Sequence, residues 1–96
     1  RYGSQATKTK IFVGTVTNFF AKINVAEIRI ETQDLKVGDD IMIIGPTTGV
    51  YEDKVSEIRV DLKPVESTEK GELCSIPVKD VIRRGDKVYK VIDAES

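Results

Sequence analysis

Short apolar runs alternate with polar segments along the whole of this 96-residue chain. The clearest case is the segment 25–31, in which three aliphatic residues alternate with three charged ones: Ala26, Ile28 and Ile30 against Glu27, Arg29 and Glu31. Strict alternation predicts a half-buried strand with a solvated outer face. Further runs rich in β-branched residues predict strands at 10–20, 41–44, 50–63, 73–78 and 88–92. No segment carries a convincing helical pattern.

Three glycines are each followed at once by an acidic residue and a return to apolar positions. The pairs are Gly38 with Asp39, Gly71 with Glu72, and Gly85 with Asp86. Glycine takes positive φ freely and aspartate tolerates turn geometry, so each pair predicts a tight structural turn that leads into a strand. Six strands joined by short turns predict an all-β fold, a small antiparallel barrel.

Two positions interrupt the predicted strands. Gly14 lies inside the first strand and predicts a bulge or sharp bend there. The irregular spacing of apolar residues in 50–63 predicts a second bulge near Ser56 and Glu57. We expect a single domain over 10–92, a linker or the tail of a preceding domain over 1–9, and a frayed end over 93–96. Because the chain opens on Arg1 rather than Met, we expect it to be a piece of a longer polypeptide.

Charge and composition argue against several functions. The chain has 15 basic and 16 acidic residues, interspersed, with a formal net charge of −1. Non-specific binding to DNA or to an anionic membrane needs a positive excess, so neither partner is expected. The chain has no histidine, and its one cysteine, Cys74, lies in an apolar strand pattern. We therefore expect a buried thiol, a cytoplasmic location, no catalytic residue, no metal site and no cofactor.

The order of strands and turns resembles the second domain of translational GTPases such as elongation factor Tu. The matching segments are 13–16, 35–41, 55–58, 64–73 and 81–88. This resemblance implies a six- to seven-stranded β-barrel of the translation-protein type.

A narrower resemblance rests on the segments 2–7, 12–26 and 44–49. They are similar to the C-terminal barrel of peptidase family U32, the collagenase-like proteases, and equally to small stand-alone translation-factor-like proteins. In the U32 family the catalytic part is a larger domain that precedes this barrel. The resemblance implies a non-catalytic accessory module that packs on the catalytic domain and helps to present a protein or RNA substrate. The alternative is a translation-factor-like module that binds RNA or the ribosome.

Aromatic and basic residues supply the candidate binding surface. Phe19 and Phe20 are consecutive, so one should face the core and the other solvent. Together with Tyr51, Lys22 and Arg59 they predict a surface on which single-stranded RNA stacks. The alternative is that the aromatic rings pack in the core or against another domain.

Three short motifs have plainer interpretations. Arg84, Gly85 and Asp86 spell an integrin-binding tripeptide, but the same glycine–acid pair recurs twice without the arginine, so a turn is expected. The segment 45–49 lacks the lysine and spacing of a phosphate-binding loop. Asp39 and Asp40 are expected to be solvated rather than to hold a cation, because adjacent side chains on a strand point apart.

Overall fold

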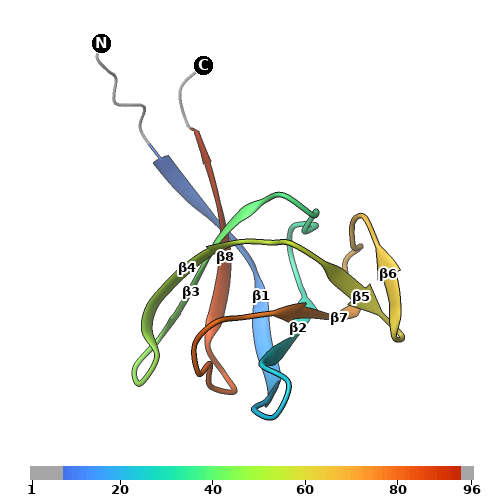
Figure 1. Ribbon diagram of the computed structural model, residues 1–96. Helices are drawn as coiled ribbons and strands as arrows, with labels where there is room; N and C mark the ends of the chain where they lie inside the picture. The colour runs from blue at the N-terminus through green and yellow to red at the C-terminus, as the bar shows by residue number, and fades with distance from the viewer. Residues whose placement is uncertain (1–7, 94–96) are drawn as a thin grey trace.

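The computed structural model describes residues 8–93, which form a single curled antiparallel sheet (Figure 1). The eight strands are β1 (Lys8–Phe20), β2 (Val25–Ile30), β3 (Asp40–Gly45), β4 (Gly49–Lys54), β5 (Ile58–Val60), β6 (Lys63–Val65), β7 (Leu73–Pro77) and β8 (Lys87–Asp93). Their order in the sheet is β4-β3-β8-β1-β2-β7-β5-β6. The all-β prediction is confirmed. No helix long and apolar enough to cross a membrane occurs in residues 8–93.

The strand count differs from the expected six or seven, because the predicted strand over 50–63 is three strands. Val55 leaves the ladder after β4, and Asp61 and Leu62 reverse the chain between β5 and β6. The bulge expected near Ser56 and Glu57 is therefore a full break. The sheet is also not closed by hydrogen bonds, since β4 and β6 each pair on one side only within the described residues.

The expected chain ends are only partly described. Residues 1–7 and 94–96 lie outside the described residues. Lys8 and Thr9, expected in a linker, instead pair with Asp93 and Ile92 of β8. The described domain therefore includes two residues that precede the predicted start at 10. The hydrophobic pattern missed them because a two-stranded ribbon carries polar residues on both faces.

Gly14 occupies the bend in β1, as predicted. The register of β1 shifts between Phe12 and Gly14 against β8, and between Val16 and Asn18 against β2. A Cβ at Gly14 would lie 1.8 Å from the backbone oxygen of Arg29, far inside van der Waals contact. Only glycine lets β1 and β2 approach so closely at this corner.

The core lies inside the curl of the sheet. Ala26, Ile28 and Ile30 are all fully buried, as the alternation in this strand predicts. They pack with inward residues of the other strands and of the connecting loops, which are Val13, Val16, Leu35, Ile41, Ile43, Tyr51, Val55, Ile58, Cys74, Ile76, Val78, Ile82 and Val88.

The three glycine–acid pairs form one repeated structure, which we call the Gly-acid turns: Lys36–Asp39, Glu69–Glu72 and Arg83–Asp86. The three glycines have φ of 97°, 89° and 91°. In each turn the acidic residue donates its N–H to the first residue's carbonyl, and its carboxylate accepts the first residue's N–H. Positive φ at the third position with this backbone bond is the pattern of a type II turn.

Each Gly-acid turn also holds one buried residue of a distant segment through two further backbone hydrogen bonds. The glycine N–H donates to the carbonyl of the held residue. The N–H of the held residue donates to the carbonyl of the turn's acidic residue. The held residues are Val55, Ile30 and Val16 in turn order, with N–O distances between 2.7 and 2.9 Å. The turns therefore lock distant segments together rather than merely reversing the chain.

The turns differ in how deeply the acid lies. Asp86 is 2 % exposed, and its carboxylate accepts hydrogen bonds from the Arg83 N–H at 3.0 Å and from the Thr48 hydroxyl. A Cβ at Gly45 would lie 1.8 Å from Asp86 Oδ1, so Gly45 leaves room for that carboxylate. The Arg-Gly-Asp tripeptide is thus a structural turn whose acid is withdrawn from solvent.

Candidate functional site

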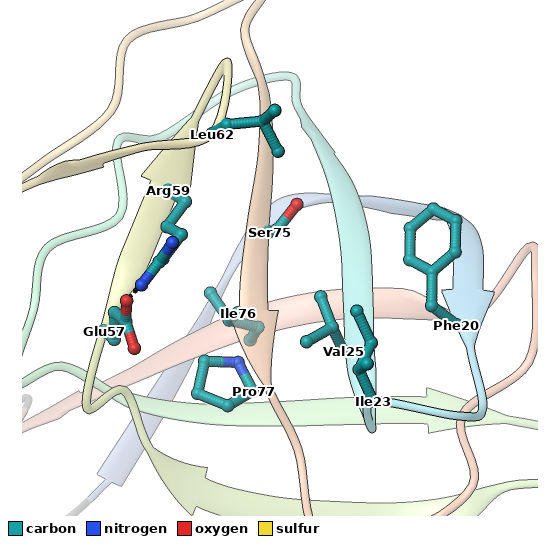
Figure 2. Close-up of a pocket in the computed structure, with 9 residues that line it drawn as sticks. All are labelled: Phe20, Ile23, Val25, Glu57, Arg59, Leu62, Ser75, Ile76 and Pro77. Carbon is teal, nitrogen blue, oxygen red and sulfur yellow. Dashed lines mark hydrogen bonds and ion pairs between the residues drawn. The ribbon is translucent and has the colours of Figure 1, made fainter.

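An apolar groove opens on the outer side of the domain, at the far end of β1 from Lys8. Its volume is about 440 Å³. Figure 2 shows the nine residues that define it, which come from the end of β1, the β1–β2 turn, β2, the residue before β5, the β5–β6 hairpin and β7: Phe20, Ile23, Val25, Glu57, Arg59, Leu62, Ser75, Ile76 and Pro77. A concave and mostly apolar surface of this size lies in the range of protein binding sites.

Two hairpin tips rise on opposite sides of the groove. Ile23, in the β1–β2 turn, is 66 % exposed, and Leu62, in the β5–β6 turn, is 88 % exposed. Both turns hold non-glycine residues at positive φ: Asn24 at 54°, Asp61 at 53° and Leu62 at 67°. Asparagine and aspartate adopt this conformation readily, whereas a leucine there is strained.

The floor of the groove is formed where the sheet pairs least. β7 pairs with β2 along all of its length, but with β5 only through Ser75 and Arg59. On the same side Arg59 Nε lies 2.5 Å from Glu57 Oε2, as the dashed line in Figure 2 marks. Both partners of this pair are about half exposed, so the groove has one neutral polar edge and an apolar floor.

The structure brings together only part of the predicted aromatic and basic surface. Phe20 and Arg59 line the groove, and Lys22 lies exposed in the adjacent β1–β2 turn. Phe19 packs against the core while Phe20 is 40 % exposed, which is the division expected for consecutive strand residues.

Tyr51 does not join this surface, because its ring is buried in the core, which is the alternative left open for the aromatic residues. Its hydroxyl donates to Asp53 Oδ2 at 2.6 Å and accepts the Lys79 N–H at 2.9 Å. Burial, followed by the bond to Asp53, raises the pKa of Tyr51 to about 12. The bond from Tyr51 in turn holds the pKa of Asp53 below its usual value. Tyr51 therefore ties β4 to the loop after β7.

Two observations bear on chemistry in residues 8–93, one on potential metal ligands and one on the thiol of Cys74. No three His, Cys, Asp or Glu side chains of this part of the chain lie close enough to hold a metal ion. Burial raises the pKa of the Cys74 thiol to about 12, so the thiol is neutral and inert at physiological pH. A second hollow, near Lys8, Asp40 and Glu52, is charged and open.

The sequence pattern indicated only Phe20 and Arg59 among the nine groove residues. It missed the other seven, of which Ile23 and Leu62 are the most exposed. Ile23 lies between two predicted strands, and Leu62 lies within the predicted strand over 50–63, where an aliphatic residue is expected. Their only signal is an isolated large aliphatic residue within a polar turn, which becomes visible once the hairpins are known.

Sequence comparison identifies relatives over nearly all of the chain. It is 51 % identical over 90 residues to a collagenase of Porphyromonas gingivalis, an alignment that covers 94 % of this chain and 22 % of that protein. It is 42 % identical over 87 residues to an uncharacterized protease of Methanocaldococcus jannaschii, covering 91 % of this chain and 21 % of that protein. The chain thus spans about a fifth of the length of these relatives. No family model matches it.

Structure comparison finds the same fold in a domain solved by itself. Two crystal structures of the C-terminal domain of a Geobacillus thermoleovorans protein assigned to the U32 peptidases match with TM-scores of 0.76 and 0.78. Sequence identity is 14 and 15 %, and the matches cover 80 and 83 % of this chain. They cover 95 and 91 % of the solved domains. The predicted resemblance to the C-terminal β-domain of U32 peptidases is confirmed.

Proposed function

We propose that this chain is the C-terminal accessory domain of a U32-type peptidase, and that it packs on the catalytic domain and helps to present a protein substrate. The observation that carries the proposal is the asymmetry of the alignment: 94 % of this chain matches 22 % of a protein named a collagenase. A chain with its own hydrophobic core that matches about a fifth of a protease is typical of an accessory domain.

The chemistry of the described residues agrees with an accessory role. Acids in the Gly-acid turns are engaged by backbone N–H groups, and the thiol of Cys74 is buried and neutral. What the surface offers instead is the apolar groove. We therefore assign binding to this domain and bond cleavage to the remainder of the parent protein.

The RNA-binding alternative has less support. A stacking surface needs accessible aromatic rings beside free cations. Of the three predicted aromatics only Phe20 is substantially exposed, and two of the cations near them are paired, Arg59 with Glu57 and Lys54 with Asp40. The net charge of −1 adds no general attraction for a polyanion.

Deleting residues 8–93 from the parent peptidase tests the accessory role. Cleavage of gelatin and of a short fluorogenic peptide should be compared in the full-length and the truncated enzyme. We expect the truncated enzyme to lose at least tenfold of kcat/KM on gelatin while it retains more of its activity on the short peptide. Equal activity of both enzymes on both substrates would contradict the proposal.

RNA binding needs a separate measurement on the isolated domain. Titration with a single-stranded RNA at low and high salt, with Phe20→Ala beside the wild-type chain, decides it. Salt-sensitive binding that the variant loses would favour the RNA-binding module instead.

A further inference from the structure

We propose that the apolar groove is the docking surface for the remainder of the parent peptidase, with Ile23 and Leu62 as its two contact points. This inference rests on the proposed function and deepens it by naming the surface and the chemistry of the contact. The expected partner surface is apolar, with one hollow for each of the two exposed aliphatic side chains.

The first argument is the distribution of exposed apolar residues. Leu62, Ile23 and Phe20 are 88, 66 and 40 % exposed, and all three border one groove floored by Val25 and Ile76. Single exposed aliphatic residues are normal on protein surfaces, but contiguous ones mark interaction sites. Permanent interfaces are the more apolar class, so this surface suits a constant neighbour better than a transient one.

The second argument is the backbone at the β5–β6 tip. Leu62 is held at a φ of 67° although its side chain makes almost no contact within the domain. A leucine in the left-handed region costs free energy relative to the usual backbone conformation. Glycine or asparagine at this position would remove that cost, so the leucine contributes something that this domain alone does not use. Contact of its side chain with another surface supplies the reason.

The third argument identifies the partner by size and reach. The relatives extend beyond the matched segment by about 320 residues, and a folded body of that length has a radius of gyration of about 20 Å. The domain itself measures 43 × 28 × 20 Å. A body of that size, joined near Lys8, can extend along β1 as far as the groove at its other end. The charged hollow near Lys8 is less suited to permanent burial, because its carboxylates would lose water.

Hydrogen–deuterium exchange tests whether the groove is covered in the full-length parent and uncovered in the isolated chain. Amide exchange should be followed in the 96-residue chain alone and in the full-length parent. The isolated form is suitable, because the related Geobacillus thermoleovorans domain was solved by itself. We expect exchange in 21–25 and 61–63 to be at least tenfold slower in the full-length protein. The β3–β4 turn over 45–49 is the internal control and should exchange alike in both.

A pair of matched variants ties any protection to the two contact points. The double variant Ile23→Asp with Leu62→Asp should lose the protection in the full-length protein. The control is Val50→Asp with Val81→Asp, whose side chains are similarly exposed, at 60 and 57 %, but lie outside the groove. The control should keep the protection. All four positions are exposed, so both variants should fold, which far-UV circular dichroism of the isolated chain verifies.

The possible outcomes separate this inference from the proposed function. Protection confined to another surface would overturn the groove assignment and leave packing on the catalytic domain intact. Identical exchange throughout both forms would overturn both. Groove protection that appears in the isolated chain as its concentration rises would show that a second copy occupies the groove. Protection that appears only when gelatin is added would show a substrate segment there, and both of these results would overturn the inference.

Discussion

The Gly-acid turns and the two hairpin tips beside the groove use left-handed backbone in opposite ways. In the turns every positive φ falls on a glycine, and the neighbouring acid and strand residues are held by hydrogen bonds. At the tips the positive φ values fall on Asn24, Asp61 and Leu62, and the aliphatic side chains there point into solvent. The turns stabilise the domain, whereas the left-handed non-glycine residues at the tips destabilise it.

The comparison also separates two uses of the same sheet. The buried polar contacts of Asp86 and Tyr51 lie around β3 and β4, and the apolar groove lies around β5, β6 and β7. Substitutions of these buried polar residues should lower the free energy of unfolding, and substitutions of the exposed groove residues Ile23 and Leu62 should leave it unchanged or raise it.

The largest effect is expected at Asp86. Asp86→Ala leaves the Arg83 N–H and the Thr48 hydroxyl without their acceptor in a buried place, so we expect a loss of about 3 kcal/mol. Asp39→Ala removes the equivalent bond from the Lys36 N–H at a more exposed turn and should cost about 1 kcal/mol. Urea unfolding of both variants measures the difference. Equal losses would show that burial of the acid does not matter.

The next effect concerns pH and Tyr51. Because the folded pKa of Tyr51 is about 12 and its ordinary value is 10.0, its contribution is fully present below pH 10 and is lost as pH rises toward 12. We expect a loss of about 2 kcal/mol over that range. Unfolding should be followed between pH 8 and 12 in the wild-type chain and in Tyr51→Phe. The variant should lose less stability between pH 8 and 12 than the wild-type chain. Subtracting the two losses removes the contribution of Cys74, which both chains share.

The contribution of Asp53 to stability depends on pH in the opposite direction to that of Tyr51. The folded pKa of Asp53 lies below 3.8, so its contribution is present above that pH and is lost as pH falls below it. Tyr51→Phe removes the main cause of that lowered pKa. Urea unfolding at pH values below 3.8 measures this. If Tyr51→Phe lost as much stability at low pH as the wild-type chain, the Tyr51 bond would not be the cause of the lowered pKa of Asp53.

A smaller effect is expected at the glycines of the turns. A Cβ at Gly38, Gly71 or Gly85 would meet no heavy atom within 4 Å, so substitution by alanine strains only the backbone. We expect each Gly→Ala variant to lose about 1–2 kcal/mol, and all three to lose similar amounts. Thermal unfolding checks this equality. A spread wider than the mean loss would show that the three turns are not equivalent.

The smallest effect has the opposite sign. Leu62→Gly should stabilise the isolated domain by about 0.5–1 kcal/mol, because it relieves the left-handed leucine and creates the Asp-Gly sequence that tight hairpins favour. A rise in Tm of several degrees is expected in thermal unfolding. Leu62→Ala keeps the strain and is the control, so it should leave the Tm unchanged. A lower Tm for Leu62→Gly would mean that the leucine is held by contacts within the domain.

Much of the fold could be predicted because its signals are local. Alternation in 25–31, the bend at Gly14 and the three Gly-acid turns each depend on residues close in sequence. The division of 50–63 into β4, β5 and β6 could not be predicted, because Val55 leaves the ladder to pair with the distant turn at Gly38. A long-range contact of this kind has no local pattern.

The site was less accessible to prediction than the fold. Phe20 and Arg59 were predicted and do line the groove. The sequence left the place of Tyr51 open between surface and core, because an aromatic residue beside a loop gives the same pattern whether its ring points inward or outward. Ile23 and Leu62 gain meaning only from the hairpins that carry them, and those hairpins meet through the sheet order rather than through the sequence.

The pairing of β1 with β8 also sets when the domain can fold. β1 is the first described strand and β8 the last, and they share the register from Lys8 with Asp93 to Thr15 with Lys87. During synthesis at about 5–20 residues per second, β1 must therefore wait several seconds for its partner to be made. Contacts between the two ends of a chain also slow folding itself, which favours milliseconds to seconds over microseconds. Until β8 arrives, one hydrogen-bonding edge of β1 has no partner strand and is open to pairing with other nascent chains.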